Sequence, residues 1–254
     1  MCGLFIVVMN TDRDNLTLRL PSFPLIFSLE GSIAAGKTTV LQSIKRQYPA
    51  WNIFYEPLHL WEENNLLENF YKFPDQFCYS LQRKIFASYL DLYQEVTTLV
   101  AQQQQSLQPI IIERGTRSAT RVFSRLARQK NYLTLEQYNF LLSNYRNTFQ
   151  LAFDLKINYI YIKSDPQVCF QRMLNRNRQS EVNSIALPYL IDLNCAYEQE
   201  FIPLTKSDFV TSAVVQGIEL SVADKSQCVI NIIQEYLQNH GARDVNSTAL
   251  AIAD

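Results

Sequence analysis

Four residues near the start of the chain have the types and spacing of a phosphate-binding loop. Gly31 and Gly36 stand five residues apart and are followed at once by Lys37 and Thr38, which matches Gly-x-x-x-x-Gly-Lys-Thr. Glycine lets the backbone point N–H groups at phosphate oxygens, lysine adds positive charge, and the threonine hydroxyl is a Mg²⁺ ligand. The motif therefore predicts a nucleoside triphosphate site with Mg²⁺ on Thr38. The residues expected to form it are Gly31, Ser32, Ile33, Ala34, Ala35, Gly36, Lys37, Thr38 and Thr39.

Two acidic residues follow apolar runs further along the chain. Glu56 ends the run 51–56, and Glu113 lies near the end of the run 109–115, directly before Arg114. Parallel sheets bind ligands at the carboxyl ends of their strands, so both acids are expected near the phosphate loop. A hydroxyl acceptor benefits from a carboxylate base, and Mg²⁺ benefits from a carboxylate ligand. The alternative is that each carboxylate only caps a helix.

The sequence argues against two other classes of triphosphate-binding protein. GTPases read their base with Asn-Lys-x-Asp, which this sequence does not contain. Motor and AAA-type ATPases usually end a strand with an Asp-Glu pair, where this chain has Glu113-Arg114. The loop is therefore expected to serve a different reaction.

Strands alternate with helices along the chain. The strand candidates are continuous apolar runs, which is typical of a parallel sheet covered on both faces, so we expect an α/β fold. Helices are expected over 62–105 and 116–153, and a mobile loop over the polar stretch 175–186. Strands are expected at 23–30, 51–56, 109–115, 157–163 and 214–220. Four further helices are expected: one directly after the phosphate loop, one that begins at Pro166, one that ends at about Lys206, and one over 224–239.

The expected division of the chain is one domain over residues 23–240, preceded by an arm of unknown role (1–22) and followed by a flexible tail (241–254). Net charge is −1, which argues against a nucleic-acid polymer as partner. Five widely spaced cysteines without a Cys-x-x-Cys pair predict free thiols in a reducing compartment. No apolar run approaches the ~18 residues of a membrane span, and no signal or transit segment is evident. A cytoplasmic location is therefore expected.

At this point a resemblance becomes visible. The stretches "EGSIAAGKTT", "YEPLHLW", "SLQ", "ERGTRSATRVF" and "CFQRMLNRNRQSE" are similar, in order and spacing, to those of the deoxynucleoside kinase family. The similarity covers about residues 24–206 and runs more loosely to 240. It implies a P-loop kinase fold with a five-stranded parallel sheet flanked by helices and an Arg-rich lid. It also implies ATP as phosphoryl donor with Mg²⁺, a deoxyribonucleoside as acceptor, and a homodimer.

The resemblance assigns roles to matching positions. Glu56 would be the general base for the 5′-hydroxyl, and Arg114 would contact the 5′-oxygen and the transferring phosphoryl group. Gln82 would pair with the base edge, Tyr71 and Glu181 would contact the 3′-hydroxyl, and Glu113 would help to hold Mg²⁺. Lys37 completes the catalytic set. The residues expected around the nucleoside are Glu56, Trp61, Tyr71, Gln82, Tyr89, Arg114, Ala119 and Glu181, and those of the lid are Arg172, Arg176 and Arg178.

Four positions depart from the family pattern or bear on base choice. Gly115 replaces a serine, and Ser180-Glu181 replaces a pair of acids in the lid. Ala119 and Tyr89 stand where the deoxycytidine-preferring branch has aspartate and arginine, which would crowd the C5 side of a pyrimidine. We therefore expect thymidine to be accepted, although the bulk of Tyr89 could restrict the pocket.

Two other functions would also use a phosphate-binding loop of this kind. A thymidylate-type nucleoside monophosphate kinase would need an arginine for the acceptor phosphate, and Glu56 speaks against it. A non-catalytic relative should have lost central groups, yet Lys37, Thr38 and Arg114 are present. The sequence therefore favours a kinase that phosphorylates the 5′-hydroxyl of deoxyribonucleosides, in nucleotide salvage.

Overall fold

The computed structural model describes residues 25–102, 108–152, 155–182, 184–206, 212–216 and 220–249. The expected arm, 1–22, lies outside the described residues. The centre of the fold is one parallel sheet of five strands, as expected from the sequence, and the order of the strands is β2-β3-β1-β4-β5. The strands are β1 (Ile26–Glu30), β2 (Asn52–Phe54), β3 (Ile110–Glu113), β4 (Asn158–Lys163) and β5 (Ser212–Gln216).

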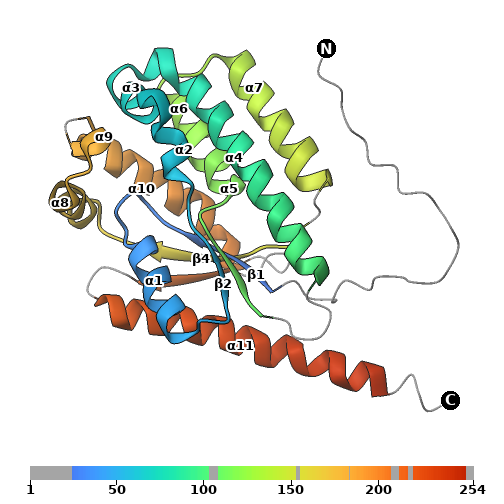
Figure 1. The fold of residues 1–254 in the computed structure, drawn as a ribbon. Coiled ribbons are helices and arrows are strands. Elements are labelled where there is room, and N and C mark those ends of the chain that lie inside the picture. Colours follow the sequence, from blue (N-terminus) through green and yellow to red (C-terminus); the bar gives the residue numbers. More distant parts are fainter. Residues whose placement is uncertain are drawn as a thin grey trace, which may run out of the picture.

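Helices cover both faces of this sheet (Figure 1), where α1 and α11 lie below it and α4, α7 and α10 lie above it. The α-helices are α1 (Lys37–Gln47), α2 (Leu58–Glu62), α3 (Leu66–Lys72), α4 (Pro74–Gln102), α5 (Thr116–Ser118), α6 (Arg125–Gln129), α7 (Leu135–Asn144), α8 (Pro166–Arg176), α9 (Gln179–Val182), α10 (Leu187–Phe201) and α11 (Val222–Ala249). The remaining helical segments are η1 (Glu63–Asn65), η2 (Ala119–Ser124), η3 (Tyr145–Ala152) and η4 (Pro203–Lys206), of which η2 and η3 are π-helical.

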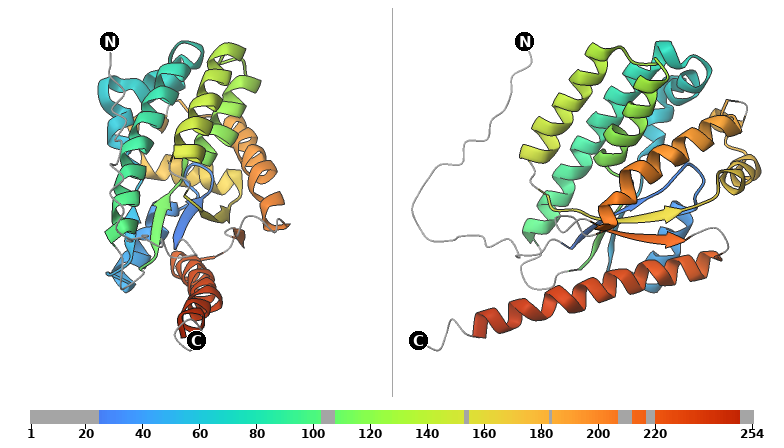
Figure 2. Two further views of the ribbon diagram at one scale, coloured as in Figure 1. Left: turned by 90° about the vertical axis from the view of Figure 1, so that its right-hand side faces the viewer. Right: turned by 180° about the vertical axis from the view of Figure 1, so that it is seen from behind.

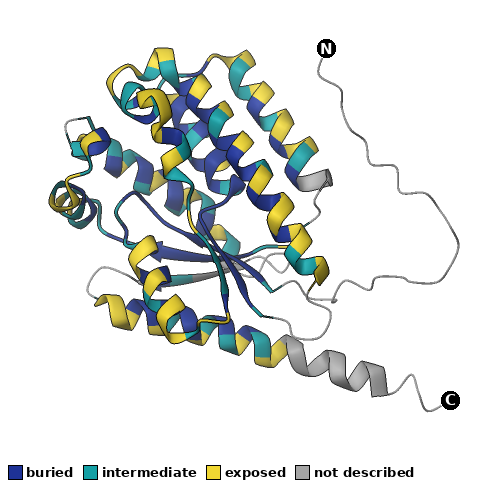
Figure 3. Ribbon diagram, in the orientation of Figure 1, coloured by how far each residue is buried: buried dark blue, intermediate teal, exposed yellow. Residues whose placement is uncertain are grey.

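The central strands are buried because helices pack on both of their faces. Every residue of β1 and β3 is buried, which explains their continuous apolar runs. One hydrophobic cluster joins β1 and β4 to α1, α10 and α11, and a second joins β3 to α3, α4 and α7. The rear and side views (Figure 2) show the same layers, and Figure 3 shows the buried strands between half-exposed helices. The sheet thus fixes the ends of β1 and β3 side by side.

Three expected elements differ from the structure. The fifth strand begins at Ser212 rather than at position 214, and its pairing with β4 is described as far as Gln216, opposite Lys163; positions 217–219 of the expected strand lie outside the described residues. The expected loop 175–186 contains the short helix α9, whose Glu181 forms ion pairs with nearby arginines. The last helix reaches Ala249 instead of ending near Asn239, since one glycine at position 241 costs only about 1 kcal/mol. The expected tail therefore begins inside α11, and residues 250–254 lie outside the described residues.

In the part of the chain that the structure describes, no helix is both long enough and apolar enough to cross a membrane.

Candidate active site

The phosphate loop connects β1 to α1 and adopts a conformation that depends on its glycines. Gly31 has φ 152°, and a Cβ there would lie 2.9 Å from the Ile162 carbonyl oxygen. Gly36 has φ 98° and directly precedes α1, and Ala34 also has a positive φ of 58°. Within the described residues no side chain caps the N-terminus of α1. Its first N–H groups and its partial positive charge are therefore available to an anion.

Lys37 lies folded against the loop. Its Nζ donates hydrogen bonds to the carbonyl oxygens of Gly31, at 3.0 Å, and Ser32, at 2.9 Å. Burial and, to a smaller extent, the charge of Arg114 lower the pKa of Lys37 from 10.5 to about 8, while Glu113 opposes the shift. The ammonium group is thus held at the loop, where phosphate oxygens would raise its pKa again.

Thr38 and Glu113 meet across the sheet although they are 75 residues apart. The hydroxyl of Thr38 donates to Glu113 Oε1 at 2.6 Å, because β1 and β3 are neighbours, Glu113 is the last residue of β3, and Thr38 lies in the helix that follows β1. A hydroxyl and a carboxylate are the oxygen donors that Mg²⁺ uses beside phosphate. No cluster of three or more acidic, histidine or cysteine residues that could hold a metal occurs among the described residues. The pair fits an ion that takes its other ligands from phosphates and water.

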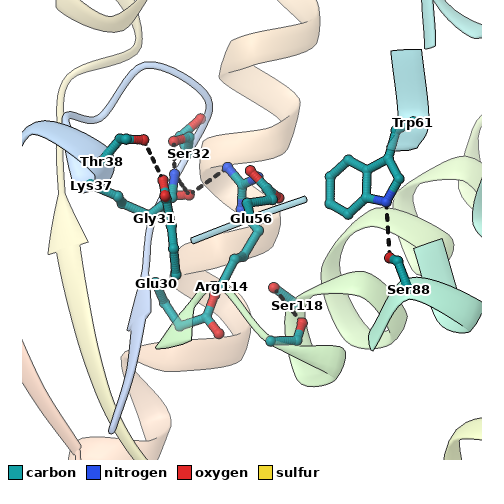
Figure 4. Close-up of polar contacts among 12 residues, drawn as sticks. Glu30, Gly31, Ser32, Lys37, Thr38, Glu56, Trp61, Ser88, Arg114 and Ser118 are labelled. Atoms are coloured by element: carbon teal, nitrogen blue, oxygen red, sulfur yellow. Dashed lines mark hydrogen bonds and ion pairs between the residues drawn. The ribbon is translucent and has the colours of Figure 1, made fainter. Parts of the chain in front are cut away.

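Glu56 and Arg114 form a buried ion pair at the same edge of the sheet (Figure 4). Their side chains are 7% and 8% exposed, and Arg114 Nη1 donates to Glu56 Oε1. Arg114 Nη2 also donates to the Gly31 carbonyl at 3.2 Å, and its guanidinium lies 5.1 Å from the ring centre of Phe123. Arg114 has φ 59°, which is uncommon for a bulky residue and directs the side chain from β3 toward the phosphate loop.

Beneath the loop, Glu30 is fully buried at the end of β1. Ser28 Oγ donates to Glu30 Oε1 at 2.7 Å, and burial raises the pKa of Glu30 above 4.5. Gly115 lies against this group, where a Cβ would be 3.1 Å from Ser28 Oγ and 3.3 Å from the Tyr93 hydroxyl. The absent side chain at position 115 therefore leaves room for Glu30 and its neighbours.

One cavity of about 600 Å³ connects the phosphate loop with the acceptor residues. The expected site residues that line it are Ile33, Ala34, Gly36, Lys37, Thr38, Thr39, Glu56, Trp61, Tyr71, Gln82, Tyr89, Glu113, Arg114, Ala119, Arg172, Arg176, Arg178 and Glu181. Three expected residues of the phosphate loop do not line the cavity: Gly31, Ser32 and Ala35. The carbonyl oxygens of Gly31 and Ser32 instead hold the Lys37 ammonium group. The positions selected from the sequence thus converge on a single cavity.

The apolar half of this cavity is walled by aromatic residues. The Trp61 and Tyr89 rings are 6.2 Å apart in an edge-to-face arrangement, and Trp61 Nε1 donates to Ser88 Oγ at 3.0 Å. Burial raises the pKa of Tyr71 and of Tyr89 well above 10, so both remain neutral phenols. Gln82 supplies an amide to the same space. This half suits a flat ring with a polar edge.

The lid arginines reach the cavity from α8 and the turn that follows it. Asp165 accepts hydrogen bonds from two backbone N–H groups at the start of α8, which fixes the direction of the helix. At its other end, Glu181 pairs with Arg176 and, at 2.9 Å, with Arg178. Glu181 is buried and holds the two guanidinium groups together.

A model of the family described as Deoxynucleoside kinase matches residues 27–238. This chain belongs to that family. The kinase is 31% identical over 173 residues to a probable deoxycytidine kinase of fowlpox virus, covering 68% of this chain and 69% of the relative. It is 30% identical over 196 residues to a deoxyguanosine kinase of Dictyostelium discoideum, covering 75% of this chain and 63% of that one. Among solved structures, the deoxyadenosine kinase of M. mycoides has a similar fold, with a TM-score of 0.68 and 23% sequence identity. The match covers 83% of this chain and 99% of that chain. These relatives are named for three different bases.

Sequence reasoning missed some cavity residues of this deoxynucleoside kinase. Most are apolar residues at helical positions, such as Phe70 and Phe123, which a sequence cannot distinguish from ordinary core residues. Tyr189 comes from α10, in a segment where the sequence predicted a helix but no site residue. The missed lining residues are Gln42, Leu58, Leu67, Phe70, Leu81, Ile85, Phe123, Asn175 and Tyr189.

Proposed function

We propose that this kinase transfers the γ-phosphoryl group of ATP to the 5′-hydroxyl of pyrimidine deoxyribonucleosides, including thymidine. The observation that carries the proposal is the buried Glu56–Arg114 pair, which lies in one cavity between the phosphate loop and the aromatic half. A carboxylate at that junction suits an acceptor that must lose a proton.

At the acceptor, Glu56 takes the proton of the 5′-hydroxyl as the oxygen attacks the γ-phosphorus. Arg114 holds the carboxylate in place and offers positive charge to the equatorial oxygens of the transferring group. Both side chains are nearly removed from water, so their electrostatic effect is stronger than at the surface. The proton leaves on Glu56, and the bond from the γ-phosphorus to the ADP oxygen breaks.

At the donor, the N–H groups at the start of α1 and the ammonium of Lys37 bind the β- and γ-phosphates. Mg²⁺ on Thr38 and Glu113 would neutralise phosphate charge and align the triphosphate. Arg176 and Arg178 approach from the lid and exclude water when it is closed, which limits ATP hydrolysis. Arg172 lines the same end of the cavity.

At the nucleoside, Trp61 and Tyr89 contact the sugar and base, Tyr71 and Glu181 bind the 3′-hydroxyl, and Gln82 reads the base edge. Acceptance of thymidine is supported by Ala119, which lines the cavity and offers a small uncharged methyl group in place of the aspartate of the deoxycytidine-preferring branch. The proposal also includes a homodimer and a cytoplasmic location. It further includes a single domain over residues 23–240, and the extent of the family match, 27–238, supports this last part.

The test is a product analysis. Purified protein with ATP and Mg²⁺ is incubated separately with the four deoxyribonucleosides and with thymidine monophosphate, and products are separated by chromatography. Monophosphates from deoxycytidine and thymidine are expected. Product from deoxycytidine but not thymidine would remove the thymidine assignment. Product from thymidine monophosphate alone would identify a nucleoside monophosphate kinase, and no product with ATP bound would identify a non-catalytic relative.

A further inference from the structure

A hydrogen bond lies directly behind the side chain proposed to read the base. Gln82, on α4, lines the cavity and is 2% exposed, while Ser124, the last residue of η2, is fully buried behind it. Ser124 Oγ lies 3.1 Å from Gln82 Oε1 and 2.8 Å from the Ala119 carbonyl oxygen. Among the described residues the Gln82 side chain makes no other hydrogen bond. Its remaining donors and acceptor are therefore available to a ligand.

The Ser124 hydroxyl can support the amide in two orientations. A serine hydroxyl has one hydrogen and two lone pairs, so it cannot donate fully to both neighbours at once. In the first arrangement it donates to Gln82 Oε1. In the second it donates to the Ala119 carbonyl and accepts an N–H from the amide turned through 180°. Each arrangement gives the rear of the amide one hydrogen bond, so neither orientation leaves a buried polar atom of Gln82 without a partner there.

The two orientations present opposite hydrogen-bonding patterns to a nucleoside. Cytosine and adenine have a ring nitrogen acceptor beside an amino donor, whereas thymine and guanine have a ring N–H donor beside a carbonyl acceptor. An amide that pairs with both atoms of one edge must turn over to pair with both atoms of the other. A side chain that tolerates only one orientation would therefore select one class of base.

On the proposed function, we infer that Ser124 is a positioning residue that allows Gln82 to read both kinds of base edge. Without the hydroxyl, the orientation that turns the amide nitrogen inward leaves a buried N–H without an acceptor. In the opposite orientation Gln82 Oε1 points inward and is left with one unused lone pair. This costs less free energy than an unpaired N–H, because the oxygen still accepts a hydrogen bond from the base. Ser124 thereby removes a bias that would otherwise restrict the site to one class of base.

The experiment compares kcat/KM for deoxycytidine and thymidine in the full-length enzyme with ATP and Mg²⁺. The wild type is expected to use both nucleosides with values within about tenfold of each other. Ser124→Ala should shift their ratio by about five- to tenfold, the effect of one unmade buried hydrogen bond. Ser124→Cys, which nearly keeps the shape but bonds weakly, should shift the ratio in the same direction.

The matched control is Thr120→Val. Thr120 is a fully buried hydroxyl residue of the same η2 segment, and it donates to the Thr116 carbonyl at 2.7 Å; among the described residues it forms no hydrogen bond with Gln82. Its removal should leave the ratio of the two kcat/KM values unchanged, even if it lowers stability. A ratio that moves equally in Thr120→Val and in Ser124→Ala would overturn the inference.

Two further outcomes contradict the inference. A wild-type preference above about 100-fold for one base would show that Gln82 is held in one orientation. A ratio within twofold of wild type in both Ser124 variants would show that the hydroxyl does not act through Gln82. Either result leaves the proposed kinase function standing. A wild type that phosphorylates neither nucleoside would remove both together.

Discussion

The Glu56→Gln variant tests the central assignment because it removes the carboxylate charge and keeps the shape. Glutamine retains Oε1, so Arg114 can still donate to position 56 and the geometry of the pair should persist. A positioned general base contributes about 10²- to 10⁴-fold to rate. At about 1.36 kcal/mol for each factor of ten, this corresponds to about 3–5 kcal/mol of transition-state stabilisation. We therefore expect kcat with deoxycytidine or thymidine to fall by about 10²- to 10⁴-fold.

Binding of ATP should survive this change. Among the described residues Glu56 forms its hydrogen bond and ion pair with Arg114 and none with the phosphate loop, so the Kd for ATP, measured by calorimetry, should stay within about threefold of wild type. Thermal unfolding should show a moderate loss of stability, since a buried guanidinium that is 8% exposed loses its anionic partner. The expected pattern is thus slow chemistry in a folded enzyme that still binds its donor.

The matched control is Glu63→Gln. Glu63 lies seven residues further along, is 50% exposed and pairs with Lys84 at the surface, so its loss should change kcat by less than twofold. If Glu56→Gln lowered kcat by less than tenfold, with an unchanged pH profile, Glu56 could not be the base. The general-base argument would then be wrong although the fold assignment would remain.

Three further predictions follow from charged groups of the site. Because the pKa of Lys37 is about 8, kcat/KM for ATP should fall by about tenfold per pH unit above pH 8, and a flat profile to pH 9.5 would contradict this. Glu30→Gln tests the linkage between stability and pH. Because the pKa of Glu30 in the folded protein is raised above 4.5, the wild-type protein should lose stability as the pH rises from 4.5 through the raised value. The variant has no carboxyl at this position, so its free energy of unfolding in urea should increase relative to that of the wild type over the same range. A difference in unfolding free energy that is constant with pH would refute it. Glu113→Gln should raise the Mg²⁺ concentration for half-maximal rate by about tenfold with little change in nucleoside KM; an unchanged Mg²⁺ dependence would remove Glu113 from the metal site.

Much of this architecture could be predicted from local sequence patterns. Apolar runs place the strands, and Gly31 and Gly36 place the loop, because local sterics decide both. The order of the strands and the contact between Thr38 and Glu113 could not be derived from those patterns alone, since pairing across 75 residues depends on the whole sheet. The family resemblance supplied only the role of Glu113 in holding Mg²⁺, and the strand order was not predicted.

Other features escaped prediction for physical reasons that are specific to the site. The contact between Gln82 and Ser124 joins two helices across 42 residues, and nothing in either local sequence marks it. The short helix α9 lies in a polar stretch without apolar periodicity, and its Glu181 forms ion pairs with Arg176 and Arg178 rather than packing against a core. Patterns of hydrophobicity cannot find an element of that kind.

The pairing of Glu181 with Arg176 and Arg178 has a consequence for the salt dependence of the enzyme. Two guanidinium groups that face a cavity without a counterion would repel each other and collect anions from solution. Here the counterion is part of the chain and is buried between them. On the proposed function, arrival of a triphosphate exchanges one internal anion for another and releases few ions to the solvent. Its affinity should therefore depend on ionic strength less than the number of arginines at the cavity would suggest.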